Sequence, residues 1–303
     1  MEKHQMKKRI LVGLITGAAL LTLAACGGTN SSSSTSGSDS SKALSGQIIS
    51  GGSTALQPLV QQASTEFMTK NPNVQITVQG GGSGVGLTQV AAGSFQIGNS
   101  DIFAEEKTGI DSSAITDNKV AVVGFAPIVN SKTSVDNLTK QQLIDIFTGK
   151  ITNWKEVGGS DQKITVIGRT AGSGTRVNFD HFALDKATEV TGPTQDASGS
   201  VVTMVGQTPG AISYVAFSYL ETSTAVKAIS IDGVKPTDAN VQTNDWKVWS
   251  YEHMYVNTKK ATKAEKEFIN YVKNDSASLK KLGYISVSDM KVDRDSEGNV
   301  TKK

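Results

Sequence analysis

The chain has 303 residues, and its charges almost cancel: 30 Lys and Arg side chains and 28 Asp and Glu side chains leave a formal net charge of +2. The first 25 residues alone carry +3, from four basic residues and one glutamate, so the rest of the chain carries −1 and lacks the basic surface that nucleic-acid binding requires. A single cysteine, Cys26, excludes an internal disulfide and a cysteine-rich metal site.

The first segment of the chain has the features of a bacterial lipoprotein leader. Basic side chains precede an apolar stretch at residues 10–25, which is short for a membrane span. The stretch ends Leu-Ala-Ala-Cys-Gly at residues 23–27, which resembles a lipobox, whose cysteine is lipidated and becomes the mature N-terminus. We therefore expect residues 1–25 to be a signal peptide and Cys26 to carry a lipid such as palmitate. The alternative is an ordinary signal peptide followed by a chance cysteine.

Residues 26–45 consist mostly of Ser, Thr and Gly. Such a segment has almost nothing to bury, so we expect it to be a flexible tether. About 258 residues remain after Ser45, which is the length of two domains of ordinary size.

Beyond the tether, the hydrophobic pattern alternates between strand and helix. We expect strands at residues 48–49, 74–78, 95–98, 120–129, 164–167, 211–217 and 248–256. Helical patterns follow most of these strands, and residues 139–142 and 262–265 have the sequence of capping boxes. Pro127 is expected to interrupt the fourth strand. Strands that alternate with helices favour an α/β fold.

Three of the strand–helix junctions are rich in Gly, Ser and Thr: residues 51–54, 80–86 and 169–176. Glycine lets the backbone approach a ligand closely, and the free N–H groups of a helix start favour an anion. In open α/β sheets such junctions gather at the carboxyl ends of the strands, where ligands bind. The three junctions together therefore predict an anion site.

The third junction, residues 169–176, carries the strongest signal. Arg169 offers a forked cation for oxyanion oxygens, and Ser173 and Thr175 add hydroxyl groups and are candidate N-caps. Taken alone, the same residues also fit a plain strand–helix turn with a surface arginine.

Taken together, these residues resemble the phosphate-binding lipoproteins of ABC importers. The resemblance covers nearly the whole chain after residue 46 and depends on the order and spacing of short motifs. The motifs are GSTA at 52–55, GSG at 82–84, NSD at 99–101, IFTG at 146–149, NW at 153–154, Arg169 followed by GSGT at 172–175, and GAISY at 210–214.

The resemblance implies an α/β, two-lobed, periplasmic-binding-protein-like fold of type II, in which two crossover strands join the lobes. Lobe 1 would comprise residues 46–127 plus 252–303, and lobe 2 would comprise residues 128–251. The crossovers would lie near residues 125–129 and 251–255, and the anion would lie in the cleft between the lobes.

The resemblance also implies a set of phosphate contacts, which come from both lobes. Carried over residue by residue, they are Thr54, Ala55, Ser83, Asp101, Arg169, Ser173, Gly174 and Thr175. Ala55 would act through its backbone N–H. Arg176 departs from the motif, which requires no cation there, and it would either face solvent or add positive potential to the cleft.

Asp101 is an unexpected neighbour for an anion. Phosphate near neutral pH still carries a proton that it can donate, and a carboxylate can accept that hydrogen bond, whereas ionised sulfate has no proton to give. Asp101 would therefore discriminate against sulfate. The alternative is that Asp101 is a plain helix N-cap.

An enzyme is the main alternative class, in the form of a phosphatase or another hydrolase. The glycine-rich junctions lack the lysine of a nucleotide-binding P-loop, and no Gly-x-Ser-x-Gly motif surrounds their serines. After the leader only His181 and His253 remain, without metal-ligand spacing to Asp or Glu. We expect His181 at a helix surface or boundary and His253 in a crossover strand. We therefore predict no catalytic residue, no metal and no cofactor.

Two further alternatives keep the chain as a binding protein. The same scaffold would serve another oxyanion, such as sulfate or molybdate, or an organic anion. A surface adhesin would need no anion pocket, and Trp154, Trp246 and Trp249 would then be interaction residues. The prediction we retain is an extracytoplasmic, lipid-anchored monomer that binds inorganic phosphate and delivers it to the membrane permease subunits of an ABC importer.

Overall fold

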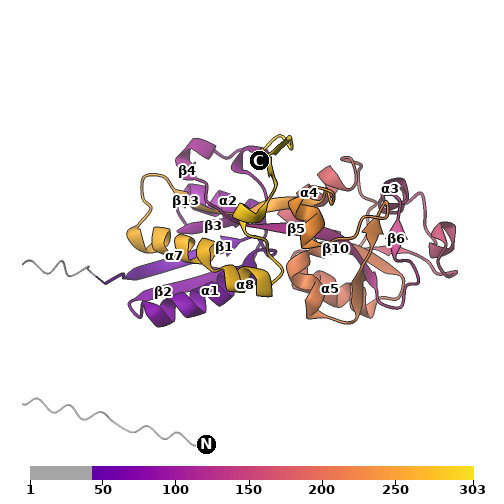
Figure 1. Cartoon of the computed structure of the whole chain (residues 1–303), viewed down its shortest axis with the longest axis horizontal. Coiled ribbons are helices and arrows are strands. Elements are labelled where there is room, and N and C mark those ends of the chain that lie inside the picture. The colour runs from indigo at the N-terminus through magenta and orange to yellow at the C-terminus, as the bar shows by residue number, and fades with distance from the viewer. Residues whose placement is uncertain (1–42) are drawn as a thin grey trace, which may run out of the picture. The chain divides into compact units, whose positions relative to one another are not determined.

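A computed structural model describes residues 43–303, which form one compact unit (Figure 1). The signal peptide predicted at residues 1–25, Cys26 and most of the predicted tether lie outside the described residues. Within the described part, no helix has both the length and the apolar character that a membrane span needs.

The elements alternate along the chain, with several short strands near its end. The strands are β1 Gly46–Gly52, β2 Val74–Gln79, β3 Ile97–Ser100, β4 Ile115–Thr116, β5 Lys119–Asn130, β6 Asn137–Leu138, β7 Thr165–Val166, β8 Gly168–Arg169, β9 Thr194–Gln195, β10 Ala211–Ala216, β11 Val226–Ala228, β12 Ser230–Ile231, β13 Trp249–Asn257, β14 Val292–Arg294 and β15 Val300–Lys302. The helices are α1 Gln57–Lys70, α2 Ser83–Ala92, α3 Lys140–Phe147, α4 Gly174–Phe182, α5 Ser198–Gln207, α6 Asp238–Gln242, α7 Lys263–Asn274 and α8 Ser276–Lys281.

The main sheet is mixed. Its order is β2-β1-β3-β13-β5-β10-β7, with β11 beside β5 and β4 beside β13. β1 pairs in parallel with β2 and β3, and β10 pairs in parallel with β7. The two strands between these parallel parts, β5 and β13, are antiparallel to each other. Parallel pairs linked through helices confirm the predicted α/β class.

The long strand β5 joins the two parallel parts of the sheet. Its residues 119–124 pair with β13, and its residues 125–129 pair with β10. The partner changes after Gly124, where a Cβ atom would lie 2.4 Å from the ring of Phe217. The expected interruption at Pro127 is wrong, because β5 continues through this residue, whose carbonyl accepts a hydrogen bond from the N–H of Ile229 at 3.1 Å.

Segments from the two ends of the described chain pack together. Figure 1 shows α7 and α8, near the C-terminus, next to α1 and the first strands. The rings of Phe67 on α1 and Phe268 on α7 meet edge to face, with centroids 5.3 Å apart. On the other part of the sheet, Phe179 of α4 stacks on Tyr214 of β10 at 4.2 Å.

The helix starts follow the local sequence signals. Both predicted capping boxes are present: Thr139 Oγ1 accepts the N–H of Gln142 at 3.1 Å, and Thr262 Oγ1 accepts the N–H of Glu265 at 3.3 Å. Pro58 lies in the first turn of α1, where its missing N–H is not needed. These signals work because a helix start has N–H groups without intrahelical partners, which nearby side chains can satisfy.

The strand predicted at residues 48–49 is longer in the structure, and the three tryptophans are core residues. Gly51 and Gly52 belong to β1 rather than to a loop, because they pair with Gln79 and Asn99 of the neighbouring strands. A Cβ atom on Gly52 would lie 2.2 Å from the Asn99 carbonyl, so the close pairing there requires glycine. The tryptophans considered as adhesin interaction residues are buried, each at most 1% exposed: Trp154, Trp246 and Trp249.

Candidate anion-binding site

Arg169 ends the short strand β8 and is completely buried. Its guanidinium donates to the carbonyls of Gln195 at 3.1 Å and Asp196 at 3.0 Å. It also donates to Thr54 Oγ1 at 3.3 Å and to Ser198 Oγ at 3.5 Å. Among residues 43–303, no carboxylate forms an ion pair with it. We call Arg169, Thr54 and Ser198 the Arg169 cluster.

The electrostatics of the Arg169 cluster are unbalanced. Burial lowers the pKa of Arg169, because loss of water disfavours the cation, while Tyr214 and Asp101 act in the opposite direction. A buried cation that meets only neutral oxygens is costly. The cluster is therefore suited to an anion, whose charge would offset this cost.

Ser198 is a member of this cluster that sequence reasoning missed. It is the first residue of α5, and its N–H and hydroxyl lie 3.3 Å and 3.1 Å from Thr54 Oγ1. The preceding N-cap, Ala197, provides no side-chain hydrogen bond, and the first N–H of α5, that of Ser198, donates to Thr54 Oγ1 of the cluster instead. The available signal was the Ser-Gly-Ser run that precedes the apolar face of this helix.

A second cluster surrounds Asp101, directly after β3, and we name it the Asp101 cluster: Asp101, Ser83 and Thr175. The Thr175 hydroxyl donates to Asp101 Oδ2 at 2.9 Å, and the Asp101 N–H donates to Ser83 Oγ at 2.9 Å. Asn178 of α4 donates to the Asp101 carbonyl at 2.8 Å. The N-cap alternative for Asp101 is wrong, since the next short helix has Phe103 at its N-cap.

Glycines bring the second and third junctions into direct contact. The N–H of Gly84 donates to the carbonyl of Gly172 at 3.1 Å. A Cβ on Gly82 would lie 2.6 Å from the same carbonyl, and one on Gly174 would lie 2.3 Å from Ser83 Oγ. We expected these glycines to admit a ligand. In the structure they let two loops approach each other, which encloses the site.

Two other predicted contacts have local partners, one in a helix cap and one within its own loop. Ser173 is the N-cap of α4, and its hydroxyl accepts the N–H of Arg176 at 3.2 Å. The N–H of Ala55 donates to Ser53 Oγ at 3.0 Å, so the structure gives it a partner within its own loop. The carbonyl of Ala55 accepts the hydroxyls of Ser218 and Tyr284. The backbone N–H of Ala55, the group predicted to bind the anion, is therefore already occupied by Ser53.

Arg176, the departure from the motif, is half-buried, and its charge is compensated by acidic neighbours. Its Nη1 donates to the Arg169 carbonyl at 2.7 Å, and its guanidinium pairs with Asp180 at 3.3 Å and Glu189 at 3.5 Å. Burial and the neighbouring Asp180 raise the pKa of Glu189 to about 7. Arg176 thus braces the backbone of Arg169 while its own charge is balanced.

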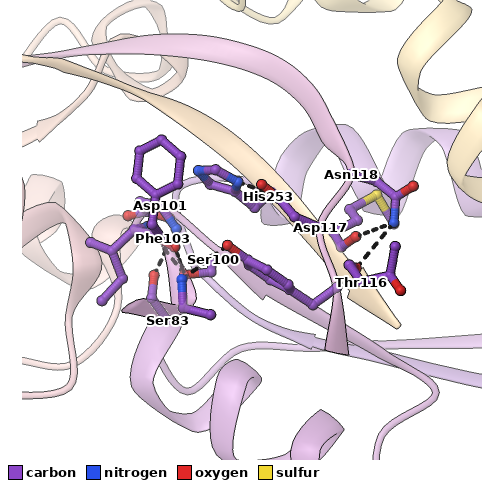
Figure 2. A network of polar contacts seen from close by, with 12 residues as sticks. Ser83, Ser100, Asp101, Phe103, Thr116, Asp117, Asn118 and His253 are labelled. Carbon is purple, nitrogen blue, oxygen red and sulfur yellow. Dashed lines mark hydrogen bonds and ion pairs between the residues drawn. The ribbon is translucent and has the colours of Figure 1, made fainter. Parts of the chain in front are cut away.

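Behind Asp101, a polar network fixes the end of β3. Figure 2 shows Asp101 next to Ser83 and Ser100, with His253 of β13 close by. The Ser100 hydroxyl donates to the carbonyl of Ile102 at 2.7 Å, which closes a tight turn just beyond Asp101. His253 is completely buried, and its Nδ1 lies 2.8 Å from Asp117 Oδ1. These contacts hold Asp101 in place without using its carboxylate.

The features expected of a metalloenzyme were not found in the described part of the chain. No group of three or more His, Cys, Asp or Glu side chains there is arranged to hold a metal ion. His181 is half-buried near the end of α4 and stacks on Phe182, which confirms its predicted boundary position. His253 lies on β13, as predicted.

The mixed sheet, with polar clusters at its strand ends and helix starts, defines an α/β ligand-binding domain. The chain belongs to the PBP superfamily, whose domain model matches residues 37–276. This finding confirms the periplasmic-binding-protein-like fold that the motifs implied.

Individual relatives agree with this assignment. The phosphate-binding protein PstS of Bacillus subtilis (strain 168) is 49% identical over 299 residues, which cover 97% of this chain and 99% of that protein. PstS of Staphylococcus aureus (strain USA300) is 27% identical over 297 residues, or 93% and 89% of the two chains. A structure from Clostridium perfringens, assigned as a phosphate ABC transporter substrate-binding protein with bound phosphate, has a TM-score of 0.75 at 31% identity and covers 80% of this chain and 100% of its own.

Proposed function

We propose that this protein binds inorganic phosphate outside the cytoplasm and delivers it to the membrane permease subunits of an ABC importer. The support is the family and the names of its relatives, among them a phosphate-binding protein that is 49% identical over almost the whole chain. The relatives are transport proteins, and we assign no catalytic residue, cofactor or metal to this chain.

Arg169 is the observation that carries the proposal. It is completely buried, meets two carbonyls and two hydroxyls, and has no ion pair among the described residues. Phosphate would supply the missing negative charge, and a planar guanidinium matches the geometry of phosphate oxygens. The hydroxyls of Thr54 and Ser198 can rotate to donate to the same anion.

The rest of the proposed site follows from the two clusters. The proposed phosphate contacts are Thr54, Ala55, Ser83, Asp101, Arg169, Ser173, Gly174 and Thr175, to which we add Ser198. The start of α4 would contribute backbone N–H groups, and Ser83 and Thr175 would contribute hydroxyls. Ala55 would contribute only if its N–H leaves Ser53, which makes it the weakest member of the set.

Asp101 would choose between phosphate and sulfate. Its Oδ1 is buried and has no hydrogen-bond partner among the described residues. An ionised Asp101 would accept the proton of bound phosphate in a charge-assisted hydrogen bond. Sulfate has no proton to offer and would meet a bare negative charge.

We also propose that residues 46–127 plus 252–303 and residues 128–251 act as two lobes that close on the anion. The contacts from Thr175 to Asp101 and from Arg169 to Thr54 join these two parts and would form only on closure. Small-angle scattering should show a smaller radius of gyration when phosphate is added. An unchanged radius would argue against lobe closure.

Anchoring completes the proposal. Cys26 would hold the protein at the cell membrane through a lipid, and residues 26–45 would give a monomeric binding domain its reach. A Cys26→Ala protein should leave the membrane fraction. If it remains membrane-bound after a high-salt wash, the lipid anchor is not at Cys26.

Calorimetry tests the central proposal directly. The purified protein is titrated separately with phosphate, sulfate and molybdate at one pH and one ionic strength. We expect saturable binding of phosphate with one site and much weaker binding of the other two. Preferential binding of sulfate or molybdate would show that this anion, and not phosphate, is the ligand. If none of the three anions binds, the proposed anion site is refuted.

A further inference from the structure

Glu252 is a buried acid outside both the Arg169 cluster and the Asp101 cluster. It lies on β13, is completely buried, and neither of its carboxyl oxygens accepts a hydrogen bond from an N–H or hydroxyl donor among residues 43–303. The register between β13 and β5 shifts at Glu252 and His253, which face Ala121 and Lys119 and leave Val120 of β5 as an extra, bulged residue. Such bulges redirect side chains, often beside a functional site.

The pairing of β13 with β3 places Glu252 beside Asp101. β13 pairs with β3 so that His253 lies opposite Ser100, and the next residues along the two strands are Glu252 and Asp101. Burial, and then Asp101 as a charged and hydrogen-bonding neighbour, raise the pKa of Glu252 well above its usual range. Oδ1 of Asp101 is itself without any other partner among the described residues.

Two neighbouring carboxyls can satisfy each other only if one of them carries a proton, because an ionised carboxylate has no hydrogen to donate. The surroundings decide which one it is. Asp101 receives the Thr175 hydroxyl on Oδ2 at 2.9 Å, which stabilises a negative charge there. Glu252 receives no donor from the rest of the described chain, so the negative charge is more stable on Asp101.

Other ionisable groups around Glu252 leave this assignment unchanged. Tyr219 and Tyr284 are close enough for an electrostatic effect, and burial, more than any neighbouring charge, raises the pKa of both tyrosines, to about 12 for Tyr219. Their hydroxyls donate to the carbonyls of Thr54 and Ala55 rather than to Glu252. The adjacent His253 is directed to Asp117.

Building on the proposed phosphate function, we propose that Glu252 is a positioning residue for anion selectivity. It stays protonated at neutral pH and donates a hydrogen bond to Oδ1 of Asp101. The pair then holds one proton and one negative charge. Two ionised carboxylates would repel phosphate as well as sulfate, and two protonated ones would tolerate sulfate. A single shared proton leaves Asp101 ionised, and because each carboxylate oxygen has two lone pairs, Asp101 can accept from Glu252 and Thr175 and still accept the proton of phosphate.

Two variants separate hydrogen bonding from space filling. Glu252→Gln keeps a donor toward Asp101 but cannot ionise, whereas Glu252→Leu removes the donor at similar volume. For each protein, the dissociation constants of phosphate and sulfate are measured from pH 6 to pH 9. We expect the leucine variant to lower the preference for phosphate over sulfate at least tenfold, because the carboxylate of Asp101 then loses the donor that positions it. The glutamine variant should restore most of that preference, and its phosphate constant should change with pH in parallel with that of the wild type.

Two outcomes of these titrations would overturn the proposal. If Glu252→Gln binds phosphate at least tenfold more tightly than the wild type at pH 8, Glu252 is ionised in the native protein. If Glu252→Leu keeps the full preference for phosphate, Glu252 only fills space. Glu265→Gln is the matched control, because Glu265 is a buried glutamate that caps α7 through Thr262.

Infrared difference spectra read the protonation state without any ligand. The wild type minus Glu252→Gln should show the carbonyl stretch of a protonated carboxylic acid at neutral pH, and this band should be absent from the control difference with Glu265→Gln. Absence of the band would overturn the assignment even if phosphate binds. Failure of phosphate to bind with the band present would instead refute the proposed function and leave the protonated pair in place.

Discussion

Arg169 and Arg294 are both buried, and neither forms an ion pair among the described residues, yet their surroundings differ. The guanidinium of Arg294, on β14, lies 3.9 Å from the ring centre of Phe182 and 4.0 Å from that of Trp249. It also donates to the carbonyl of Lys247 at 2.9 Å. Within residues 43–303 no aromatic ring makes a cation–π contact with Arg169, which instead faces the hydroxyls of the Arg169 cluster.

The difference shows that a missing ion pair does not by itself identify a ligand site. Aromatic faces attract the charge of Arg294 and fill the space around it, so this arginine needs no further partner. Hydroxyl groups beside Arg169 act as acceptors now and can turn to become donors, which an anion between them would require. Burial lowers the pKa of both arginines, and to about 9 for Arg294, so the surroundings rather than burial distinguish them.

Alanine substitutions of the two arginines should affect different properties of the protein, phosphate binding for Arg169 and stability for Arg294. Arg169→Ala removes the cation that would pair with a desolvated anion, a loss that typically costs about 2–5 kcal/mol. Because each ~1.4 kcal/mol changes the dissociation constant tenfold, phosphate binding should weaken roughly 30-fold or more. Calorimetry measures this loss.

Arg294→Ala is the matched control. It should lower the thermal unfolding midpoint, because two aromatic rings lose their partner, and leave the phosphate dissociation constant within about threefold. The comparison fails if Arg169→Ala weakens binding less than threefold, or if Arg294→Ala weakens it as strongly as Arg169→Ala does.

The next largest effect is expected at Asp101, on the preference for phosphate over sulfate. Asp101→Asn keeps the size of the side chain and removes its charge, so sulfate should bind better while phosphate still binds. The preference for phosphate should shrink by roughly tenfold or more if the repulsion is worth at least about 1.4 kcal/mol. Both dissociation constants are measured at one pH and one ionic strength. Asp238→Asn, at the start of α6, should leave their ratio unchanged, and an unchanged ratio in Asp101→Asn itself would remove Asp101 from anion selection.

Local signals in the sequence predicted much of the fold. The capping boxes at Thr139 and Thr262 are confirmed because they depend on residues within one helical turn. The α/β alternation and the family are confirmed as well. Pro127 was misjudged because its effect depends on which backbone groups the neighbouring strands use, and this information is not local.

The candidate site shows where sequence reasoning stops. Motifs placed Arg169 and Asp101 at strand ends, but the partner of Thr54 is Ser198, 144 residues away. Glu252 lies within an apolar run that predicts a buried strand, and nothing near it in sequence indicates a second carboxyl beside it. Arg176 shows the converse, because its two acidic partners could be assigned only after the chain was folded.

A smaller effect on phosphate binding is expected from Ser198, the third member of the Arg169 cluster. Ser198→Ala removes one hydroxyl from the first turn of α5 but keeps the backbone N–H groups. A typical hydrogen bond contributes about 0.5–1.5 kcal/mol, so phosphate binding should weaken roughly two- to tenfold. Ser200→Ala, two residues further along the helix and on the surface, is the matched control. An effect as large as that of Arg169→Ala would mean that Ser198, and not the arginine, provides most of the binding.

The smallest predicted effect concerns Arg176, whose charge is balanced by Asp180 and Glu189. Burial and Asp180 raise the pKa of Glu189 to about 7, above its usual value of 4.5. The folded protein therefore holds this proton more tightly than the unfolded chain. The resulting stability is fully present below about pH 4.5 and is lost as the pH rises through 7.

Glu189→Gln cannot ionise, so it should escape this loss. Its thermal unfolding midpoint, measured without phosphate, should rise relative to that of the wild type between pH 5 and pH 8. A gain of roughly 2–4 °C is expected if the buried charge costs about 1 kcal/mol in a domain of this size. The midpoint of Glu265→Gln should keep a constant difference from the wild type over the same range. If Glu189→Gln does the same, Arg176 stabilises the ionised Glu189 well enough that the acid pair adds no pH dependence, and the balance of charge around this arginine is complete.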